Sequence, residues 1–263
     1  MADSGTAQVQ GELWSARALD WAEVQEGTAR PLYDSVLERL ALGPDTTLLD
    51  VGCGAGLFAS LAAARGAEVH GLDAAPGLLA IARERVPQGE FQPGEIEELP
   101  YGDWTFDVVT AFNSLQFAND PANAAREAAR VAREETPVVI AVWGEPQDCD
   151  AAAYLSAMAT VMPPAPPGAP GPFALSEKAA LEGLADQAGL DLQLVEDVVC
   201  VWDYPDLDAA LRGLLSAGPA TRAIQHAGEP EVRRVATTAL EAFKRTDGSY
   251  RLENVFRYAL STA

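Results

Sequence analysis

Hydrophobic and polar residues follow two alternating periods along this chain, and together they predict a sheet interleaved with helices. Short apolar runs, typical of buried strands, alternate with segments whose apolar residues recur every three or four positions, as on one face of a helix. The apolar runs predict strands at 47–51, 68–72, near Phe91, 106–112 and 138–143. Alternating units of this length indicate a parallel sheet that helices cover on both faces.

The segments between these strands carry the start signals of helices. We expect helices at 57–65 and 77–85, and a third that has Asp120 as its N-cap and Pro121 at its first position. Proline is favoured there because its missing N–H has no partner inside the helix anyway. Before the first strand, residues 14–39 carry apolar positions at helical spacing and predict one or two further helices.

The pattern changes after the fifth strand. Residues 162–172 contain too many prolines for a helix or a central strand and predict an extended connection. Ser176 is expected to cap a helix that Gly189 ends, and a sixth strand is expected at about 192–202.

The last part of the chain predicts further helices and one more strand. Residues 207–243 have a helical pattern with an interruption at Gly218 and Pro219. Residues 250–260 alternate enough to form a seventh strand that lies antiparallel in the sheet. The complete pattern predicts an α/β fold with a seven-stranded, mostly parallel sheet whose last strand is antiparallel.

Composition narrows the classes of partner. The 263 residues suffice for a domain of α/β size with an appendage. There are 18 basic and 39 acidic residues, a formal net charge of −21. Such a surface repels phosphate backbones and anionic lipids, so we expect neither nucleic acid nor membrane as a partner. The acidity favours solubility, with a basic partner or carrier as the alternative.

Cysteines and the first residues indicate the compartment. Cys53, Cys149 and Cys200 form no C-x-x-C pair, which predicts no metal site, no disulfide framework and a reducing cytoplasm. Residues 1–5 lack the features of a signal peptide, and no apolar run reaches membrane-spanning length. We therefore expect a soluble, cytoplasmic protein, either a monomer or a homodimer.

The most informative segment is 48–57, with the sequence LLDVGCGAGL. An apolar run ends near Asp50, and Gly52, Gly54 and Gly56 follow at alternate positions before a helical pattern starts. Glycines permit a tight turn and let a ligand approach main-chain N–H groups. The N-terminus of the following helix attracts a negatively charged group. The segment thus predicts a site for a polar metabolite with an anionic end.

A glycine-rich turn alone does not identify the ligand. Gly54, Gly56 and Ala59 satisfy the dinucleotide fingerprint G-x-G-x-x-A. With Asp50 included, however, the pattern is D-x-G-x-G-x-G, which resembles motif I of the class I S-adenosylmethionine-dependent methyltransferases. Four later stretches resemble the same family in the expected order; they are 69–73, 94–100, 106–117 and 126–131.

The resemblance covers roughly residues 37–143 and departs from the family pattern at two places. The turn at 134–137 reads EETP where the family usually has Pro-Gly-Gly, but it lies at the far end of the sheet. Gln116 stands where the family often has a histidine, so no catalytic role of that histidine is transferred to this chain.

The resemblance implies a Rossmann-like fold and S-adenosyl-L-methionine as cofactor. It further suggests that the N-terminal helices, within 1–35, and two insertions, near 146–172 and 206–248, cover the cofactor as a helical lid. The cofactor-binding core is then expected at 36–145, and residues 146–263 complete it.

The resemblance also implies individual cofactor contacts. Asp50 orders the glycine turn or receives the cofactor ammonium through water, Asp73 takes the ribose hydroxyls, and Asn113 offers its carbonyl oxygen to the ammonium. Glu95 accepts from the adenine amino group while Ile96 presents its backbone N–H to a ring nitrogen. The remaining expected cofactor residues are Gly52, Cys53, Gly54, Gly56 and Ala74.

Some of these residues have alternative interpretations. Asp73 can instead cap the helix that starts at Ala75 and Pro76, and Glu95 and Glu97 can instead belong to a solvated acidic loop. Of the two histidines, His70 on a strand is expected to be structural. His226, in the second insertion, is the candidate general base, with an exposed helix-end residue as the alternative.

The expected substrate contacts are aromatic or lie at the carboxyl edge of the sheet, where ligands of open α/β folds bind. Trp14 and Trp21, seven residues apart on the N-terminal helix, share a face that belongs either to the core or to the wall of the substrate pocket. The expected contacts at the sheet edge are Gln116, Phe117 and Trp143.

These observations favour a methyltransferase that moves a methyl group from S-adenosylmethionine to an oxygen, nitrogen or carbon nucleophile of a small metabolite. Aligning the acceptor and excluding water supply most of the catalysis in such a reaction. A short-chain nicotinamide oxidoreductase needs a Tyr-x-x-x-Lys pair, and none of the six tyrosines provides one. A cyclase or sensor that binds the same cofactor without methylation remains the alternative.

Overall fold

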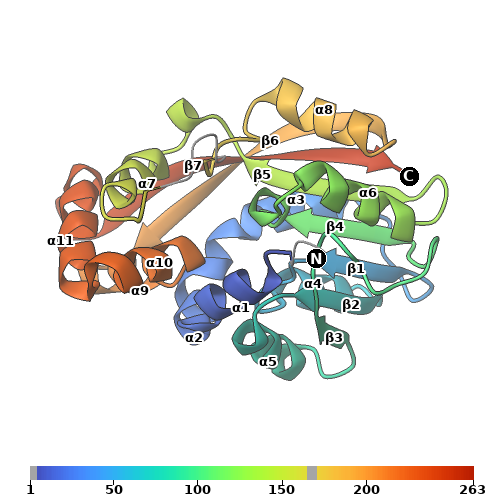
Figure 1. The fold of residues 1–263 in the computed structure, drawn as a ribbon, viewed down its shortest axis with the longest axis horizontal. Helices are drawn as coiled ribbons and strands as arrows, with labels where there is room; N and C mark the ends of the chain where they lie inside the picture. Colours follow the sequence, from blue (N-terminus) through green and yellow to red (C-terminus); the bar gives the residue numbers. More distant parts are fainter. Residues whose placement is uncertain (1–4, 165–170) are drawn as a thin grey trace.

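A single sheet runs through the molecule and separates two layers of helices (Figure 1). The computed structural model describes residues 5–164 and 171–263. The strands are β1 (Thr47–Val51), β2 (Glu68–Asp73), β3 (Glu90–Pro93), β4 (Val108–Phe112), β5 (Pro137–Trp143), β6 (Asp191–Tyr204) and β7 (Tyr250–Thr262). Their order in the sheet is β3-β2-β1-β4-β5-β7-β6.

Only β7 runs against its neighbours. It pairs antiparallel with both β5 and β6, whereas the pairs formed by β1 to β5 are parallel. Parallel strands need a helix to cross over between them, which explains the alternating pattern of the first half of the chain. The prediction of a seven-stranded, mostly parallel Rossmann-like sheet with an antiparallel last strand is confirmed.

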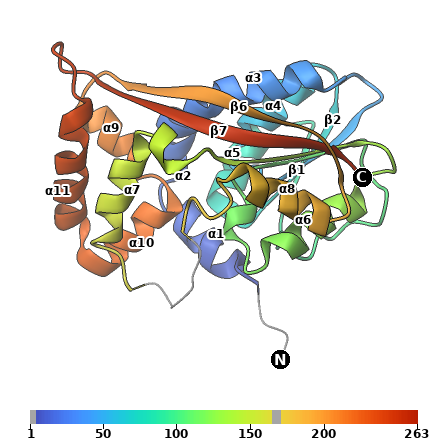
Figure 2. The ribbon, with the colours of Figure 1, turned by 90° about the horizontal axis from the view of Figure 1, so that it is seen from above.

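The helices cover both faces of this sheet and extend beyond one end of it. Their bounds are α1 (Ala7–Ser15), α2 (Ala18–Asp20), α3 (Arg30–Arg39), α4 (Leu57–Ala63), α5 (Pro76–Arg85), α6 (Pro121–Val131), α7 (Ala151–Ala159), α8 (Lys178–Gln187), α9 (Leu207–Leu214), α10 (Gly218–Ala227) and α11 (Glu229–Leu240). Figure 2 shows α3 and α4 on one face and α6 and α8 on the other.

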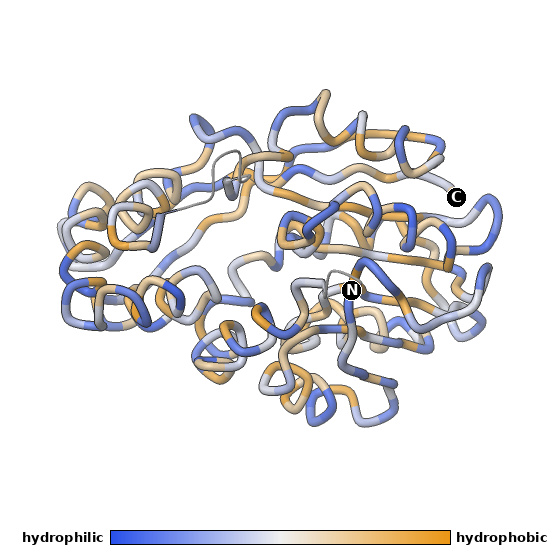
Figure 3. Tube along the Cα trace, in the orientation of Figure 1, coloured by the Kyte–Doolittle hydropathy of each residue, from blue (hydrophilic) through white to orange (hydrophobic). Residues whose placement is uncertain are grey.

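Each face has its own hydrophobic core. Buried residues of α3, α4 and α5 form one cluster with the sheet, and those of α6 and α8 form the other. Every residue of β4 is buried, as expected for a central strand with both faces covered. Figure 3 shows hydrophobic residues concentrated along the central strands, with polar residues at the outer turns.

A helical group lies beyond the carboxyl ends of the parallel strands, where β6 and β7 extend past the rest of the sheet (Figure 1). It consists of α7, α9, α10 and α11, which fall in the two insertions expected as a lid. Helix α10 packs against α1, and the Arg212 guanidinium pairs with Asp20 at 2.5 Å and with Glu23. Arg17 pairs with Glu229 at 3.0 Å. These ion pairs join the N-terminal segment to the helical group.

Two expectations about helix ends have different outcomes. The Asp120 carboxylate accepts the N–H of Asn123 at 3.0 Å, so the predicted N-cap is confirmed. The predicted cap at Ser176 is wrong, because α8 begins one residue later, after Glu177, and has no side-chain cap. Ser176 is buried instead, and its carbonyl oxygen accepts from Arg257 Nη1 of β7 at 2.6 Å.

Two further expectations concern connections. Trp14 and Trp21 do not share one helix, since α1 ends at Ser15 and Trp21 begins a π-helical turn, η1 (Trp21–Gln25), after the short α2. A 3-10 turn, η2 (Glu26–Ala29), leads from η1 into α3. Of the predicted proline-rich connection at 162–172, residues 165–170 lie outside the described residues.

Candidate cofactor and substrate site

The glycine turn between β1 and α4 has a backbone that favours glycine at all three positions. Gly52, Gly54 and Gly56 have φ angles of 78°, 56° and 78°, in the left-handed region. A Cβ on Gly52 would also lie 2.3 Å from the Ser114 Cβ, and one on Gly56 would lie 2.9 Å from the Ala82 Cβ of α5. The turn therefore keeps its shape only with glycine, and Gly56 serves helix packing.

The acid at the end of β2 links this turn to the next crossover. The Asp73 carboxylate accepts the N–H of Gly54 at 2.9 Å and the N–H of Ala75 at 2.8 Å. Burial raises the pKa of this carboxyl group, and the bonds from the backbone oppose that change. Asp73 does not cap α5, whose N-cap residue is Ala75 and which has no side-chain cap, and Asp73 lines the cavity described below.

The acid ahead of the glycines lies beneath the turn. Asp50 is 2% exposed, and Thr110 Oγ1 of β4 donates to its carboxylate at 2.8 Å. Burial raises the Asp50 pKa to about 7, the bond from Thr110 opposes this, and the negative charges of Asp73 and Glu26 add to it. Asp50 does not line the cavity. Of its two expected roles, ordering the turn fits this placement.

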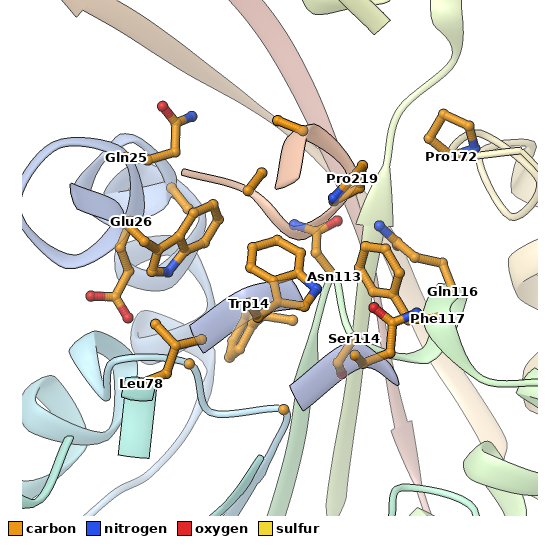
Figure 4. Close-up of a pocket in the computed structure, with 18 of the residues that line it drawn as sticks. Trp14, Gln25, Glu26, Leu78, Asn113, Ser114, Gln116, Phe117, Pro172 and Pro219 are labelled. Atoms are coloured by element: carbon orange, nitrogen blue, oxygen red, sulfur yellow. The ribbon is translucent and has the colours of Figure 1, made fainter. Parts of the chain in front are cut away.

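A cavity of about 240 Å³ opens at the carboxyl edge of the sheet, beside the glycine turn. In Figure 4, Trp14 lies between Glu26 and Leu78 on one side and Asn113 and Phe117 on the other. The predicted site residues that line this cavity are Trp14, Trp21, Gly52, Gly54, Asp73, Ala74, Glu95, Ile96, Asn113, Gln116, Phe117 and Trp143. The structure thus brings most of the expected residues together.

Two side-chain amides in the cavity wall have unused acceptors. The buried Asn113 Oδ1 and Gln116 Oε1 have no hydrogen-bond partner among the described residues. A buried carbonyl oxygen without a donor costs free energy that a ligand N–H or O–H offsets on binding. Asn113 also has a φ of 50°, and its N–H donates to the Ala141 carbonyl at 2.8 Å. These observations fit an amide that receives a ligand ammonium.

Glu95 and Glu97, in the loop after β3, make different contacts. Glu97 lies away from the cavity wall, and its carboxylate accepts the N–H groups of Asn119 at 2.7 Å and of Asp120 at 3.2 Å. Glu95 lines the cavity, and its Oε2 accepts the N–H of Ala7, at the start of α1, at 2.8 Å. Glu95, rather than Glu97, is therefore placed to meet a ligand.

A carboxylate that the sequence did not single out occupies the N-terminus of α4. Glu26 is 3% exposed, its Oε1 accepts the N–H of Leu57 at 3.3 Å, and its Oε2 pairs with Arg85 Nη1 at 2.5 Å. Burial raises the Glu26 pKa, and Arg85 opposes the rise. The position predicted for an anionic ligand group is thus taken by the chain itself. The sequence pattern does not predict Glu26 as a site residue, because Glu26 lies at the junction of the short helical turns η1 and η2 rather than on one face of a regular helix.

Aromatic rings line the rest of the cavity. The Trp14 ring lies 4.9 Å from that of Trp21 and 5.6 Å from that of Phe117, both edge to face. Of the two interpretations of Trp14 and Trp21, the wall of the pocket fits their placement. Cavity residues that the sequence analysis missed include Tyr33, Tyr154, Trp202 and Phe256. They come from elements far apart in the chain, so no local pattern connects them.

The structure places two expected site residues away from the cavity. His226 is exposed on α10, whose buried face carries Ala220 and Ala223, and it does not line the cavity. Its expected role as base is therefore not supported by this geometry. The Cys53 side chain lies against Gly71 of β2, and the Cys53 N–H donates to the Leu72 carbonyl at 3.1 Å. Cys53 supports the turn from behind.

His70 also lies outside this cavity, as a structural residue of β2. Its ring nitrogens lie 3.4 Å from Glu68 and 3.5 Å from Glu90. Within the described ranges, no group of three His, Cys, Asp or Glu side chains has the geometry of a metal site. Over the same part of the chain, no helix combines the length and hydropathy needed to cross a bilayer.

The fold and the cavity define a class. A parallel sheet with a glycine turn after β1, an acid at the end of β2 and a cavity at the topological switch between β1 and β4 is the arrangement of Rossmann-like nucleotide-binding proteins. Residues 49–140 match the family model described as "Methyltransferase domain". This match identifies a methyltransferase domain within the chain and supports S-adenosylmethionine as its cofactor.

Named relatives agree with this family. A malonyl-acyl-carrier-protein O-methyltransferase of Serratia marcescens is 38% identical over 45% of this chain and 48% of its own length. A demethylmenaquinone methyltransferase of Renibacterium salmoninarum is 32% identical over 46% and 51%. The chain spans about half the length of the curated relatives it matches. An S-adenosylmethionine-dependent methyltransferase of Thermotoga maritima shares the fold, with a TM-score of 0.57, 15% identity and coverage of 96% and 99%.

Proposed function

We propose that this protein transfers the methyl group of S-adenosylmethionine to an oxygen, nitrogen or carbon nucleophile of a small molecule. One observation carries the proposal. A single cavity joins the glycine turn and Asp73 to an aromatic compartment, and its wall holds the unpartnered Asn113 carbonyl oxygen. A cofactor end and an acceptor end in one continuous cavity are what methyl transfer requires.

The residues around the turn suggest how the cofactor is held. Asp73 receives the ribose hydroxyls, and Glu95 and Ile96 meet the adenine. Asn113 accepts from the ammonium of the amino-acid tail. Glu26 already fills the N-terminus of α4 with a carboxylate, so the ammonium, rather than the carboxylate, of that tail faces Glu26.

The chain's own part in the reaction is to align and to exclude water. S-adenosylmethionine, when bound, supplies an electrophilic methyl group. The aromatic walls and the N-terminal segment enclose the acceptor and hold its nucleophile in one orientation. Burial, with the charges of Glu26 and Asp50 adding to it, raises the Tyr33 pKa well above its usual range, so this phenol stays protonated and acts as a hydrogen-bond donor.

The alternative of a cyclase or sensor that does not methylate is not favoured. The named relatives and the matching domain model are methyltransferases. Formation of adenosylhomocysteine in the presence of an acceptor separates the two functions. We further propose that the protein acts as a monomer or homodimer, with a small molecule as its substrate.

Calorimetric titration with adenosylhomocysteine tests the cofactor site. We expect wild-type protein to bind it, and Asp73→Asn to bind it at least about tenfold more weakly, because a charge-assisted hydrogen bond to the ribose is weakened. Asp120→Asn is the matched control, since Asp120 caps α6 outside the cavity, and it should bind as wild type does. Absence of binding by folded wild-type protein contradicts the proposed function.

A further inference from the structure

The end of the cavity away from the glycine turn is lined by aromatic rings of four different elements. These rings belong to Trp143 of β5, Tyr154 of α7, Trp202 of β6 and Phe256 of β7. We call this set the aromatic compartment. The Trp143 ring lies 4.7 Å from that of Phe256 and 5.7 Å from that of Trp202. Rings at these distances form a continuous apolar wall.

Flexible apolar side chains complete this wall. Leu155 and Met158 of α7, Met162 and Leu214 also line the cavity. The Tyr154 hydroxyl group donates to the Leu214 carbonyl at 3.1 Å, so its hydrogen is already bound within the protein. Burial raises the Tyr154 pKa, and the group stays neutral. The compartment therefore offers mainly ring faces and methyl groups to an occupant.

The charged side chains in the described cavity wall are all acidic, and they lie on its cofactor side. They belong to Glu26, Asp73 and Glu95. No lysine, arginine or histidine belongs to the part of the wall that the structure describes. An anionic acceptor would lose its hydration without gaining a counter-ion, and transfer of an unpaired charge from water to an apolar site is strongly unfavourable.

One polar group of the compartment lacks a partner. Trp202 is 6% exposed and lines the cavity, and its buried Nε1–H has no acceptor among the described residues. Indole N–H groups normally find an acceptor when they are buried. A carbonyl, ether or hydroxyl oxygen on an occupant supplies the missing acceptor.

From the apolar wall, the one-sided charge and the unpartnered donor, we propose that the methyl acceptor is an uncharged, flat, largely apolar molecule, such as an aromatic or polycyclic ketone or phenol, whose oxygen accepts from Trp202 Nε1. This inference rests on the proposed function and names the substrate class of the same site. It assigns Trp202 as a positioning residue for the acceptor.

Three bicyclic probes of similar size test the substrate class. They are tetralin, which is apolar, 1-tetralone, which adds a neutral carbonyl oxygen, and tetrahydro-2-naphthoate, which adds a negative charge. Calorimetry in the presence of saturating adenosylhomocysteine should give a dissociation constant for 1-tetralone at least about tenfold lower than that for the carboxylate. A carboxylate that binds as tightly as 1-tetralone, or no binding of 1-tetralone up to its solubility, overturns the proposal.

Variants test the role of the indole N–H. Trp202→Phe keeps a ring but removes the donor, so it should weaken 1-tetralone binding about threefold to tenfold and leave tetralin binding unchanged. Trp104→Phe, at a position that is 61% exposed and outside the cavity, should change neither. Equal effects of Trp202→Phe on both probes overturn the assignment of Trp202.

Adenosylhomocysteine binding separates this inference from the proposed function. Wild-type and Trp202→Phe proteins should bind adenosylhomocysteine alike, which also shows that the variant is folded. If wild-type protein does not bind it, the proposed function fails. If it binds but the carboxylate competes equally with 1-tetralone, only the acceptor class fails.

Discussion

Three carboxyl groups, those of Glu26, Asp50 and Asp73, are crowded around the glycine turn. Arg85 pairs with Glu26, and a threonine hydroxyl and backbone N–H groups serve the other two. Burial raises the pKa of all three. In the free protein the ionised forms of these carboxyl groups are therefore disfavoured, and a ligand that carries an ammonium and a sulfonium group would stabilise them.

Asp50 is expected to make the stability of the free protein depend on pH. Its pKa is about 7 in the folded chain against an ordinary value of 3.8, so the folded state holds this proton more tightly than the unfolded state. The contribution of Asp50 to the free energy of unfolding is therefore complete below about pH 4 and is lost as the pH rises to about 7. By linkage it amounts to a few kcal/mol, on the order of 4 at most.

Asp50→Asn should remove this dependence, because a neutral amide can still accept from Thr110. Urea unfolding between pH 4 and 8 should show a variant as stable as wild type at low pH and more stable at pH 8. Asp107→Asn is a control of opposite sign. Burial raises the Asp107 pKa, but bonds from Thr47 and Arg133 outweigh it and hold the pKa low. That stabilisation is present throughout the range of pH 4 to 8 and is lost only below about pH 4, so Asp107→Asn should be less stable than wild type by a similar amount across the series. Equal pH profiles of wild type and Asp50→Asn contradict the prediction.

At the scale of elements, α1 is held against the cofactor side of the cavity at two points. Glu95 binds its first turn, and Gly11 packs on the backbone of the loop after β2. A Cβ on Gly11 would lie 2.3 Å from the Ala74 carbonyl oxygen. Close packing of α1 on this loop thus depends on a residue without a side chain, and α1 in turn brings Trp14 over the cavity.

Gly11→Ala should displace α1 and lower both stability and adenosylhomocysteine affinity. Overpacking of this kind costs about 1–3 kcal/mol, because the contact is with backbone that cannot rotate away. Gly27→Ala is the matched control, since a Cβ on Gly27 meets nothing within 4 Å; its effect should stay within about 0.5 kcal/mol. Thermal unfolding and calorimetry measure the two effects. A Gly11→Ala protein indistinguishable from Gly27→Ala would show that α1 does not need this contact.

At the scale of the whole molecule, net charge is the dominant electrostatic property. A formal charge of −21 on 263 residues repels itself in the compact state. We expect the midpoint of thermal unfolding at pH 7.5 to rise by a few degrees when sodium chloride increases from about 0.05 to 0.5 M, because salt screens this repulsion. Differential scanning calorimetry measures the change.

The same salt series at about pH 5 is the control. At this pH the protein is closer to its isoelectric point of about 4.3, so its net charge and the resulting repulsion are smaller. The midpoint of unfolding should therefore rise less with added salt. A salt effect of equal size at both pH values would point to ion binding or to a general effect of salt on apolar burial rather than to net charge.

The sequence by itself determined those features whose cause is local. The β1–α4 turn needs glycine at three alternate positions because their φ angles are positive, and β1 was predicted at the bounds that the structure shows. The position of Asp73 follows directly from the end of β2, and the Asp120 cap from the residues beside it. These are consequences of backbone geometry over a few residues.

Only the tertiary structure decided which distant residues share the cavity. Glu26 reaches the N-terminus of α4 from an irregular stretch 31 residues earlier in the chain. Trp202 and Phe256 meet Trp143 because β7 inserts between β5 and β6, and His226 is excluded because α10 buries its opposite face. Sequence periodicity tells which face of an element is buried, but not which other element covers it. That choice depends on packing between segments far apart in the chain.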